Sequence, residues 1–155
     1  MGCEVMLSGN PIKLEGSELK VGDKAPNFKL STLQNGDFKE LTLNDFSGKV
    51  LVLCTVLSLS TSVCNSMLHR LNEEAKKMPD VSFLVISMDL PFTQTSFLKD
   101  NKIDNVIIAS DHMDCSFSRA YGVLIPTLRC TARSVFVIGS DGIVKHVEYV
   151  PEISS

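Results

Sequence analysis

The chain has 155 residues, and its 15 basic and 18 acidic side chains give a formal net charge of -3 with three neutral His. That length suits a single domain over residues 1–155, and 44% hydrophobic with 21% charged residues excludes disordered, collagen-like and coiled-coil chains. A pI near 5.6 without a cluster of Lys and Arg argues against a nucleic-acid partner. No apolar run is long enough to span a bilayer, so we expect no membrane partner.

The N-terminus and the cysteine pattern bear on the compartment. The first residues lack a basic segment followed by an apolar one, so we expect no signal peptide. The Cys number five, at wide and irregular gaps without a C-x-x-C pair, which fits a reducing compartment and predicts a cytoplasmic protein. No His and Cys have metal-ligand spacing, and no phosphate loop or dinucleotide fingerprint occurs, so we predict neither a metal nor a cofactor.

The first predicted elements are strands. Short apolar runs around a Gly-Asn-Pro turn predict an N-terminal hairpin within residues 1–15. Residues 27–30 alternate with period 2 and lead to a polar turn at 34–37. Residues 50–57 and 81–88 are continuous apolar runs, which are typical of strands covered on both faces.

Helices are predicted between and after these strands. From Cys64 to Met78 apolar residues recur every three or four positions, which predicts an amphipathic helix that Pro79 ends. Shorter helices are predicted at 92–101 and at 114–121, the second capped by its first residue, Asp114. Further strands are predicted at 106–109, 134–138 and 143–150. The alternation predicts an α/β fold with a mixed sheet and an antiparallel edge.

One segment has the features of a reactive site. Residues 57–64 leave the carboxyl end of a buried strand and begin the long helix, where ligands of α/β sheets bind and the helix N-terminus favours a thiolate. On spacing alone, a reactive Cys64 and an ordinary core-facing Cys64 are equally good interpretations. Cys54 is expected to be an inert core thiol, whereas Cys115 and Cys130 are candidates for exposed thiols without an activating neighbour.

Several strings, taken together, resemble a known family. They are LSGNP at 7–11, VGDKAP at 21–26, TSVC at 61–64, DLPFTQ at 89–94, AYGV at 120–123 and ARSVFVI at 132–138. In this order and spacing they resemble the bacterial thiol peroxidase branch of the peroxiredoxins, the atypical 2-Cys type. The resemblance implies a thioredoxin fold with an N-terminal hairpin, a homodimer, and a thiolate that attacks the O–O bond of a hydroperoxide.

The resemblance also assigns roles to three residues. Cys64 would be the peroxidatic cysteine, Thr61 the hydroxyl that hydrogen-bonds the peroxide, and Arg133 the guanidinium that stabilises the thiolate and the transition state. An Arg beside a thiol lowers its pKa, and donors aimed at the leaving oxygen lower the barrier. Without the resemblance, Arg133 would be interpreted as a surface Arg and Thr61 as a helix cap.

The chain departs from the family pattern at several positions. The loop Pro is Leu57, the Asp before the Thr is Ser60, and the resolving cysteine is Leu98. A sulfenic acid at Cys64 therefore has no partner at the usual place. The family also continues into a final helix where this chain stops, so we expect that helix to be missing.

We therefore predict an oxidoreductase: a thiol peroxidase of one-cysteine type that reduces hydrogen peroxide or organic hydroperoxides through a Cys64 sulfenic acid. Thioredoxin, another external thiol or a second cysteine of the chain would clear that acid, with Cys115 the first choice among the chain's own thiols. The alternative is a catalytically impaired homologue that acts as a redox-sensing or binding module, which Leu57, Ser60 and Leu98 motivate. A truncated or rearranged version of an ordinary family member is a third interpretation.

Overall fold

The computed structural model describes residues 4–7, 10–16, 18–34, 36–59, 62–126 and 130–149, with the backbone alone for 4–7, 10–13, 34 and 62–64. The strands are β1 (Glu4–Leu7), β2 (Asn10–Lys13), β3 (Lys29–Gln34), β4 (Asp37–Thr42), β5 (Val50–Thr55), β6 (Val81–Ser87), β7 (Ile107–Ser110), β8 (Leu124–Ile125), β9 (Cys130–Thr131), β10 (Ser134–Ile138) and β11 (Val144–Tyr149). The helices are η1 (Leu43–Phe46, a 3₁₀ helix), α1 (Ser62–Lys77), α2 (Pro91–Asp100) and α3 (Ser116–Ala120).

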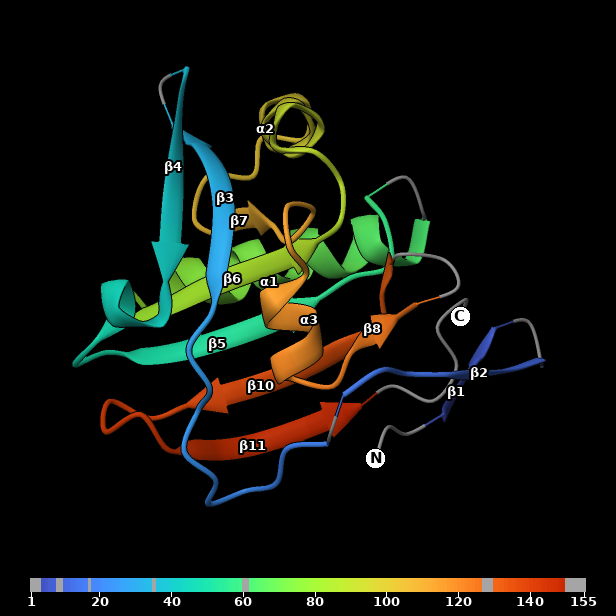
Figure 1. Ribbon diagram of the computed structural model, residues 1–155. Helices are drawn as coiled ribbons and strands as arrows, with labels where there is room; N and C mark the ends of the chain where they lie inside the picture. The colour runs from blue at the N-terminus through green and yellow to red at the C-terminus, as the bar shows by residue number, and fades with distance from the viewer. Residues whose placement is uncertain are drawn as a thin grey trace.

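A seven-stranded mixed sheet forms the centre of the molecule, in the order β11-β10-β5-β6-β7-β3-β4 (Figure 1). The neighbours β5, β6 and β7 are parallel, because α1 and α2 carry the chain back to the same end of the sheet after β5 and β6. The pairs β10-β11 and β3-β4 are antiparallel and close the two edges. The predicted mixed sheet with an antiparallel edge is confirmed, but the hairpin edge at β3-β4 was not predicted.

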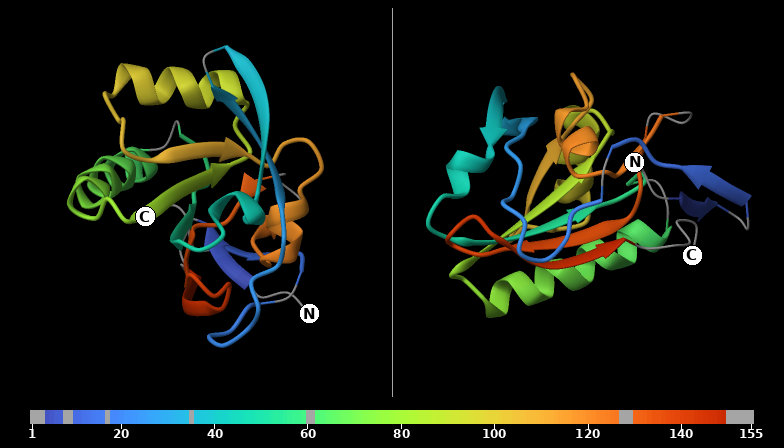
Figure 2. Two further views of the ribbon diagram at one scale, coloured as in Figure 1. Left: turned by 90° about the vertical axis from the view of Figure 1, so that its left-hand side faces the viewer. Right: turned by 60° about the horizontal axis from the view of Figure 1, so that its bottom comes forward.

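Helices cover both faces of this sheet, with α1 and α2 on one side and α3 on the other (Figure 2). On the α3 side, aromatic rings form much of the core: Phe117 stacks on Tyr121 at 4.2 Å between ring centroids, and Phe28 meets Phe117 edge-on at 5.4 Å. On the other side, Leu68 of α1 and Val85 of β6 are fully buried in a second cluster. Burial on two faces explains why β5 and β6 are continuous apolar runs.

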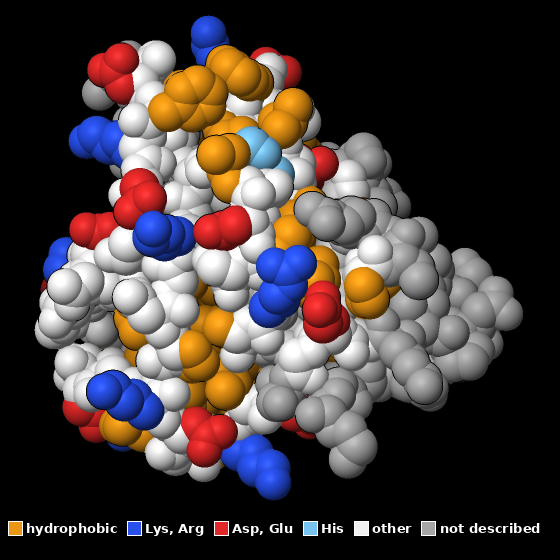
Figure 3. Space-filling model, viewed as in Figure 1, with side chains coloured by type: hydrophobic (Ala, Val, Ile, Leu, Met, Phe, Trp, Pro, Cys, Tyr) orange, Lys and Arg blue, Asp and Glu red, His pale blue; other side chains and the backbone are white. Residues whose placement is uncertain are grey.

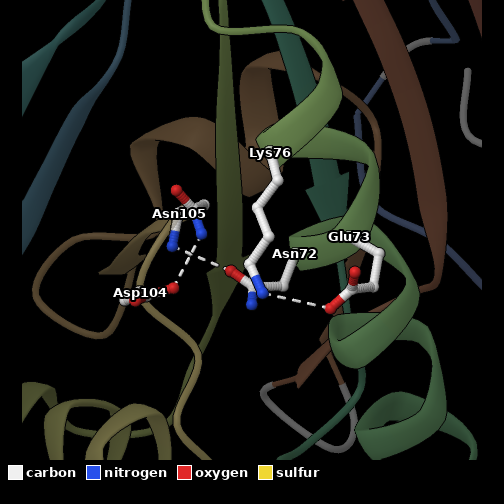
Figure 4. A network of polar contacts seen from close by, with 5 residues as sticks. All are labelled: Asn72, Glu73, Lys76, Asp104 and Asn105. Carbon is white, nitrogen blue, oxygen red and sulfur yellow. Dashed lines mark hydrogen bonds and ion pairs between the residues drawn. The ribbon is translucent and has the colours of Figure 1, made fainter.

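The long helix α1 follows the predicted pattern, with one polar exception on its inner face. Leu68 and Ala75 are buried, and Lys76 and Lys77 in the last turn complement the helix dipole. Asn72 is also buried, and its Oδ1 accepts a hydrogen bond from the backbone N–H of Asn105 at 2.8 Å (Figure 4). This contact ties α1 to the segment between α2 and β7.

The start of α3 corrects the prediction that Asp114 caps this helix. The helix begins at Ser116, and Cys115 before it has a left-handed backbone with φ 58. The buried carboxylate of Asp111 accepts hydrogen bonds from the backbone N–H groups of Phe117 (3.3 Å) and Ser118 (2.7 Å). Asp111 is therefore the residue that caps α3, and Asp114 has only a local contact with the N–H of Ser116.

Outside the main sheet, β1 and β2 form an antiparallel pair in the predicted hairpin region, and β8 pairs with β9. No helix in the described part of the chain is both long and apolar enough to cross a membrane. The expectation about a final helix concerns the chain end, where residues 150–155 lie outside the described residues.

Candidate active site

Three segments meet where β5 and β6 end, and hydrogen bonds join them. The backbone N–H of Val56 donates to Ile86 O at 3.0 Å, which extends the β5-β6 pairing by one residue. From the other side, Thr131 Oγ1 donates to Val56 O at 2.6 Å, and Thr55 Oγ1 donates to Ala132 O at 2.5 Å. The loop that leads from β5 to α1 is therefore held at its start by β6 and by the β9-β10 segment.

Asp89 holds the same loop from the end of β6. Its Oδ2 accepts the backbone N–H of Leu59 at 3.0 Å, and its Oδ1 accepts the hydroxyl of Ser58 at 3.4 Å. Ser87 Oγ donates to the same Oδ2 at 2.8 Å. The loop thus has a carboxylate anchor immediately before the residues that begin α1.

Cys64 is the third residue of α1, so its backbone lies in the first turn of a 16-residue helix. The first N–H groups of a helix have no intrahelical acceptor, and with the helix dipole they favour a negative charge at this end. The side chain of Cys64 and the whole of Thr61 lie outside the described residues. The roles predicted for these two side chains therefore remain predictions.

Arg133 lies between β9 and β10, half-buried, with its Nε atom buried. The next residue, Ser134, pairs in the sheet with Thr55, the last residue of β5. Arg133 therefore lies at the end of the sheet where β5 finishes and the loop to α1 begins. Its partial burial there is unlike an ordinary surface Arg.

The remaining described cysteines differ in their access to solvent. Cys54 is 2% exposed, and burial, with a smaller contribution from the charge of Glu148, raises its pKa to about 12, as expected of an inert core thiol. Cys115 is 1% exposed, so it is not the exposed thiol that the sequence suggested. Cys130 is half-buried on β9, where burial and then the negative charge of Asp89 raise its pKa.

A metal site finds no support in the described residues, where no group of three or more His, Cys, Asp and Glu could hold an ion. The donors at this end of the sheet are the backbone N–H groups in the first turn of α1 and the guanidinium of Arg133. Such donors can stabilise negative charge on a thiolate and on a departing oxygen.

Comparisons with known proteins agree with this architecture. The thiol peroxidase of Listeria innocua is 46% identical over 149 residues, which cover 96% of this chain and 88% of that protein. The thiol peroxidase of Bacillus subtilis is 44% identical over 153 residues, which cover 99% of this chain and 90% of that protein. The crystal structure of a peroxiredoxin-like protein from Aquifex aeolicus has a TM-score of 0.87 and 39% identity, and the match covers 98% of this chain and 88% of that one.

The parallel core with α1 at the end of β5 is the thioredoxin-like α/β fold of the peroxiredoxins, as predicted. The Redoxin family model matches residues 20–155, and the chain belongs to that family. In the sequence, Asp89 and Gln94 stand out only as part of a family string. In the structure Asp89 contacts the loop directly through Ser58 and Leu59, and Gln94 reaches Asp89 through the hydroxyl of Ser87.

Proposed function

We propose that the protein is a thiol peroxidase that reduces hydrogen peroxide or organic hydroperoxides at Cys64. Similarity over nearly the whole chain to thiol peroxidases is the observation that carries this proposal, together with the position of Cys64 in the first turn of α1. The thiolate attacks one oxygen of the O–O bond, sulfur becomes a sulfenic acid, and the other oxygen leaves as water or an alcohol after it takes a proton.

In this proposal Thr61 and Arg133 assist the reaction. The hydroxyl of Thr61 hydrogen-bonds the peroxide, and the guanidinium of Arg133 stabilises the thiolate and the negative charge on the leaving oxygen. Support for Arg133 comes from its half-buried position one residue before the strand that pairs with the end of β5. Thr61 is carried by the resemblance alone.

The sulfenic acid needs a thiol to reduce it, and we propose an external one such as thioredoxin. A thiol attacks the sulfenic sulfur, a mixed disulfide forms and water leaves, and a second thiol then releases Cys64. Position 98 on α2 is Leu, and the burial of Cys115 argues against the disulfide between subunits that the sequence had suggested. We propose that this reaction takes place in the cytoplasm, and that residues 1–155 form one domain.

We also propose that the protein forms a homodimer. Exposed hydrophobic side chains gather at the end of the molecule where β4 and α2 lie (Figure 3). They include Phe38 and Phe92, which are each 60% exposed and meet edge-on at 5.2 Å between ring centroids. Light scattering on the protein and on a Phe38→Ser, Phe92→Ser variant tests whether this patch supports association.

The enzymatic proposal is tested by stopped-flow consumption of hydrogen peroxide. We expect rapid consumption by the native protein, none above background with Cys64→Ser, and a rate at least about tenfold lower with Arg133→Met. Arg70→Met is the matched control, because Arg70 is exposed on α1 away from the loop and its loss leaves the rate unchanged. Peroxide consumption by Cys64→Ser at the native rate would contradict the proposal.

Nothing in the described structure favours the alternative of an impaired homologue that acts as a sensor or binding module. A native protein that forms a Cys64 sulfenic acid but never turns over with any thiol reductant would support that alternative.

A further inference from the structure

A chain of hydrogen bonds runs from β7 through α2 and β6 to the loop before Cys64. Gln94 of α2 is 1% exposed, and its Nε2 donates to Ala109 O of β7 at 2.9 Å and to Ser87 Oγ of β6 at 3.0 Å. Ser87 Oγ donates to Asp89 Oδ2 at 2.8 Å, and that oxygen also accepts the N–H of Leu59 at 3.0 Å. Four elements that are separate in sequence thus share one polar connection.

The direction of these bonds follows from the donors and acceptors that each group has. A hydroxyl has two acceptor positions and one hydrogen. Ser87 Oγ accepts from Gln94 Nε2 and from the backbone N–H of Asp89 at 3.2 Å, so both acceptor positions are filled. Its one hydrogen is left for Asp89 Oδ2. Gln94 therefore fixes the Ser87 hydroxyl as a donor, and that donor fixes the carboxylate that holds Leu59.

We propose that Asp89 is a positioning residue for the peroxidase site, and that Gln94 supports it through Ser87. Asp89 accepts the N–H of Leu59, five residues before Cys64, and the Ser58 hydroxyl beside it. Holding these two residues in place directs the chain into the first turn of α1. There the peroxide must be aligned with the thiolate and with the hydrogen-bond donors at the same time. This inference rests on the proposed function, since it assigns Asp89 a role in that same site.

In this proposal Asp89 acts as a hydrogen-bond acceptor and not through its negative charge. Two substitutions at position 89 separate these two roles. An Asn at position 89 keeps an amide oxygen that can accept from Leu59 N–H and Ser87 Oγ, and it removes the charge. An Ala removes both. If the acceptor positions the loop, Asp89→Asn retains most of the peroxide rate and Asp89→Ala lowers that rate about 10- to 100-fold.

Two reactions of Cys64 distinguish positioning from a change in the thiol itself. Alkylation by iodoacetamide depends on the thiolate and its access, whereas peroxide reduction also depends on aligned donors. We expect Asp89→Ala to slow peroxide reduction strongly and alkylation little. Equal loss in both reactions, or an Asp89→Asn variant as slow as Asp89→Ala, would overturn the proposal.

Asp45 provides a matched control. Its Oδ2 accepts the backbone N–H of Thr42 at 2.8 Å and the hydroxyl of Thr42 at 3.4 Å, the same kinds of contact at the start of η1. We expect Asp45→Ala and Asp89→Ala both to lower thermal stability, but Asp45→Ala should leave the peroxide rate unchanged. A similar loss of rate in both variants would mean that Asp89 acts on stability alone.

A double-mutant cycle tests the support from Gln94. Gln94→Met should slow peroxide reduction in the native background and have no further effect in the Asp89→Ala background, because the Ser87 hydroxyl then has no carboxylate to orient. Additive losses would show that Gln94 acts independently of Asp89 and would overturn that part of the proposal.

Hydrogen exchange gives a readout that does not need activity. The amide of Leu59 should exchange faster in Asp89→Ala than in the native protein, while amides of β10 should not change. If the native protein consumed no peroxide, the proposed function would fail, yet faster exchange at Leu59 would still support the anchoring contact. Unchanged exchange at Leu59 in an active enzyme would overturn the positioning role alone.

Discussion

The hydroxyl of Thr131 donates a hydrogen bond to the carbonyl oxygen of Val56 at 2.6 Å, and both residues are fully buried. This bond joins β9, two residues before Arg133, to the first residue after β5. It brings together segments that are 75 residues apart in the chain. The contact is therefore part of what places Arg133 beside the loop that leads to Cys64.

Removing that hydroxyl should destabilise the protein. Thr131→Val keeps the shape of the side chain but leaves the buried Val56 carbonyl without this donor, which costs about 1–3 kcal/mol. Denaturant unfolding measures the difference. Thr93→Val, at an exposed position on α2, is the control and should change stability by less than about 0.5 kcal/mol. Equal effects would mean that the bond to Val56 contributes nothing to folding.

The cap of α3 predicts a difference between two nearby aspartates. Asp111→Ala should cost about 1–2 kcal/mol, because it removes the acceptor for two backbone N–H groups at a buried helix start. Asp114→Ala should cost less, since its carboxylate is exposed and accepts one N–H. Thermal unfolding of the two variants decides the order. A larger loss with Asp114→Ala would restore the prediction made from the sequence.

The thiols should react in an order set by burial. In the native protein an aromatic disulfide reagent should modify Cys130 well before Cys54 and Cys115, which are almost fully buried. Mass spectrometry of peptides identifies the labelled sites, and labelling in guanidinium shows that all three can react. Rapid native labelling of Cys115, or a dimer that disappears with Cys115→Ser, would contradict the burial.

Stability should fall at alkaline pH. The pKa of Cys54 rises from the ordinary thiol value of 9.0 to about 12 in the folded protein, because burial disfavours the thiolate. Above about pH 9 the unfolded chain loses this proton while the folded chain keeps it, so unfolding is favoured by up to about 1.4 kcal/mol per pH unit. Burial also raises the pKa of Tyr121, which adds to the effect at higher pH.

Denaturant unfolding between pH 8 and about 11 measures this slope. Cys54→Ala should be less stable at neutral pH because a buried side chain is shortened, but its stability should fall less steeply with pH. Identical slopes for the native protein and the variant would show that Cys54 does not ionise differently in the two states.

A thiol introduced on α2 should react with the Cys64 sulfenic acid and form a disulfide within the chain. Leu98 is half-buried and packs against the cluster that contains Val56 and Leu59 of the loop. If Cys64 and α2 approach each other after oxidation, Leu98→Cys should give an intramolecular disulfide after one equivalent of peroxide, seen as a faster band on a non-reducing gel. Ser96→Cys, on an exposed position of α2, is the control. Failure of Leu98→Cys to form the disulfide would show that α2 does not open to Cys64.

Local patterns in the sequence were sufficient to predict the elements in which buried residues recur at a regular spacing. The continuous apolar runs predicted β5 and β6, and apolar residues at every third or fourth position predicted α1, because each pattern records which sides of an element are covered. The same reasoning missed Asn72. Its burial depends on a partner 33 residues away, and no periodicity contains that partner.

The predicted cap of α3 failed for a similar reason. Asp114 stands at the predicted helix start, but the helix begins at Ser116 after the left-handed residue Cys115, and the N–H groups of Phe117 and Ser118 donate to Asp111. Cys115 itself is 1% exposed, although the sequence had offered it as an exposed thiol. Both outcomes depend on the tertiary environment of residues 111–118, which the local sequence pattern does not indicate.

The sequence by itself determined the family, through strings spread over the whole chain, and with it the nomination of Cys64, Thr61 and Arg133. Only the tertiary structure showed that Asp89 anchors the loop before Cys64 and that Gln94 reaches the same network from α2. These contacts join residues brought together by the crossover between parallel strands. Their hydrogen-bond partners are specified by folding in three dimensions, because a polar residue in the chain does not indicate which distant donor will face it.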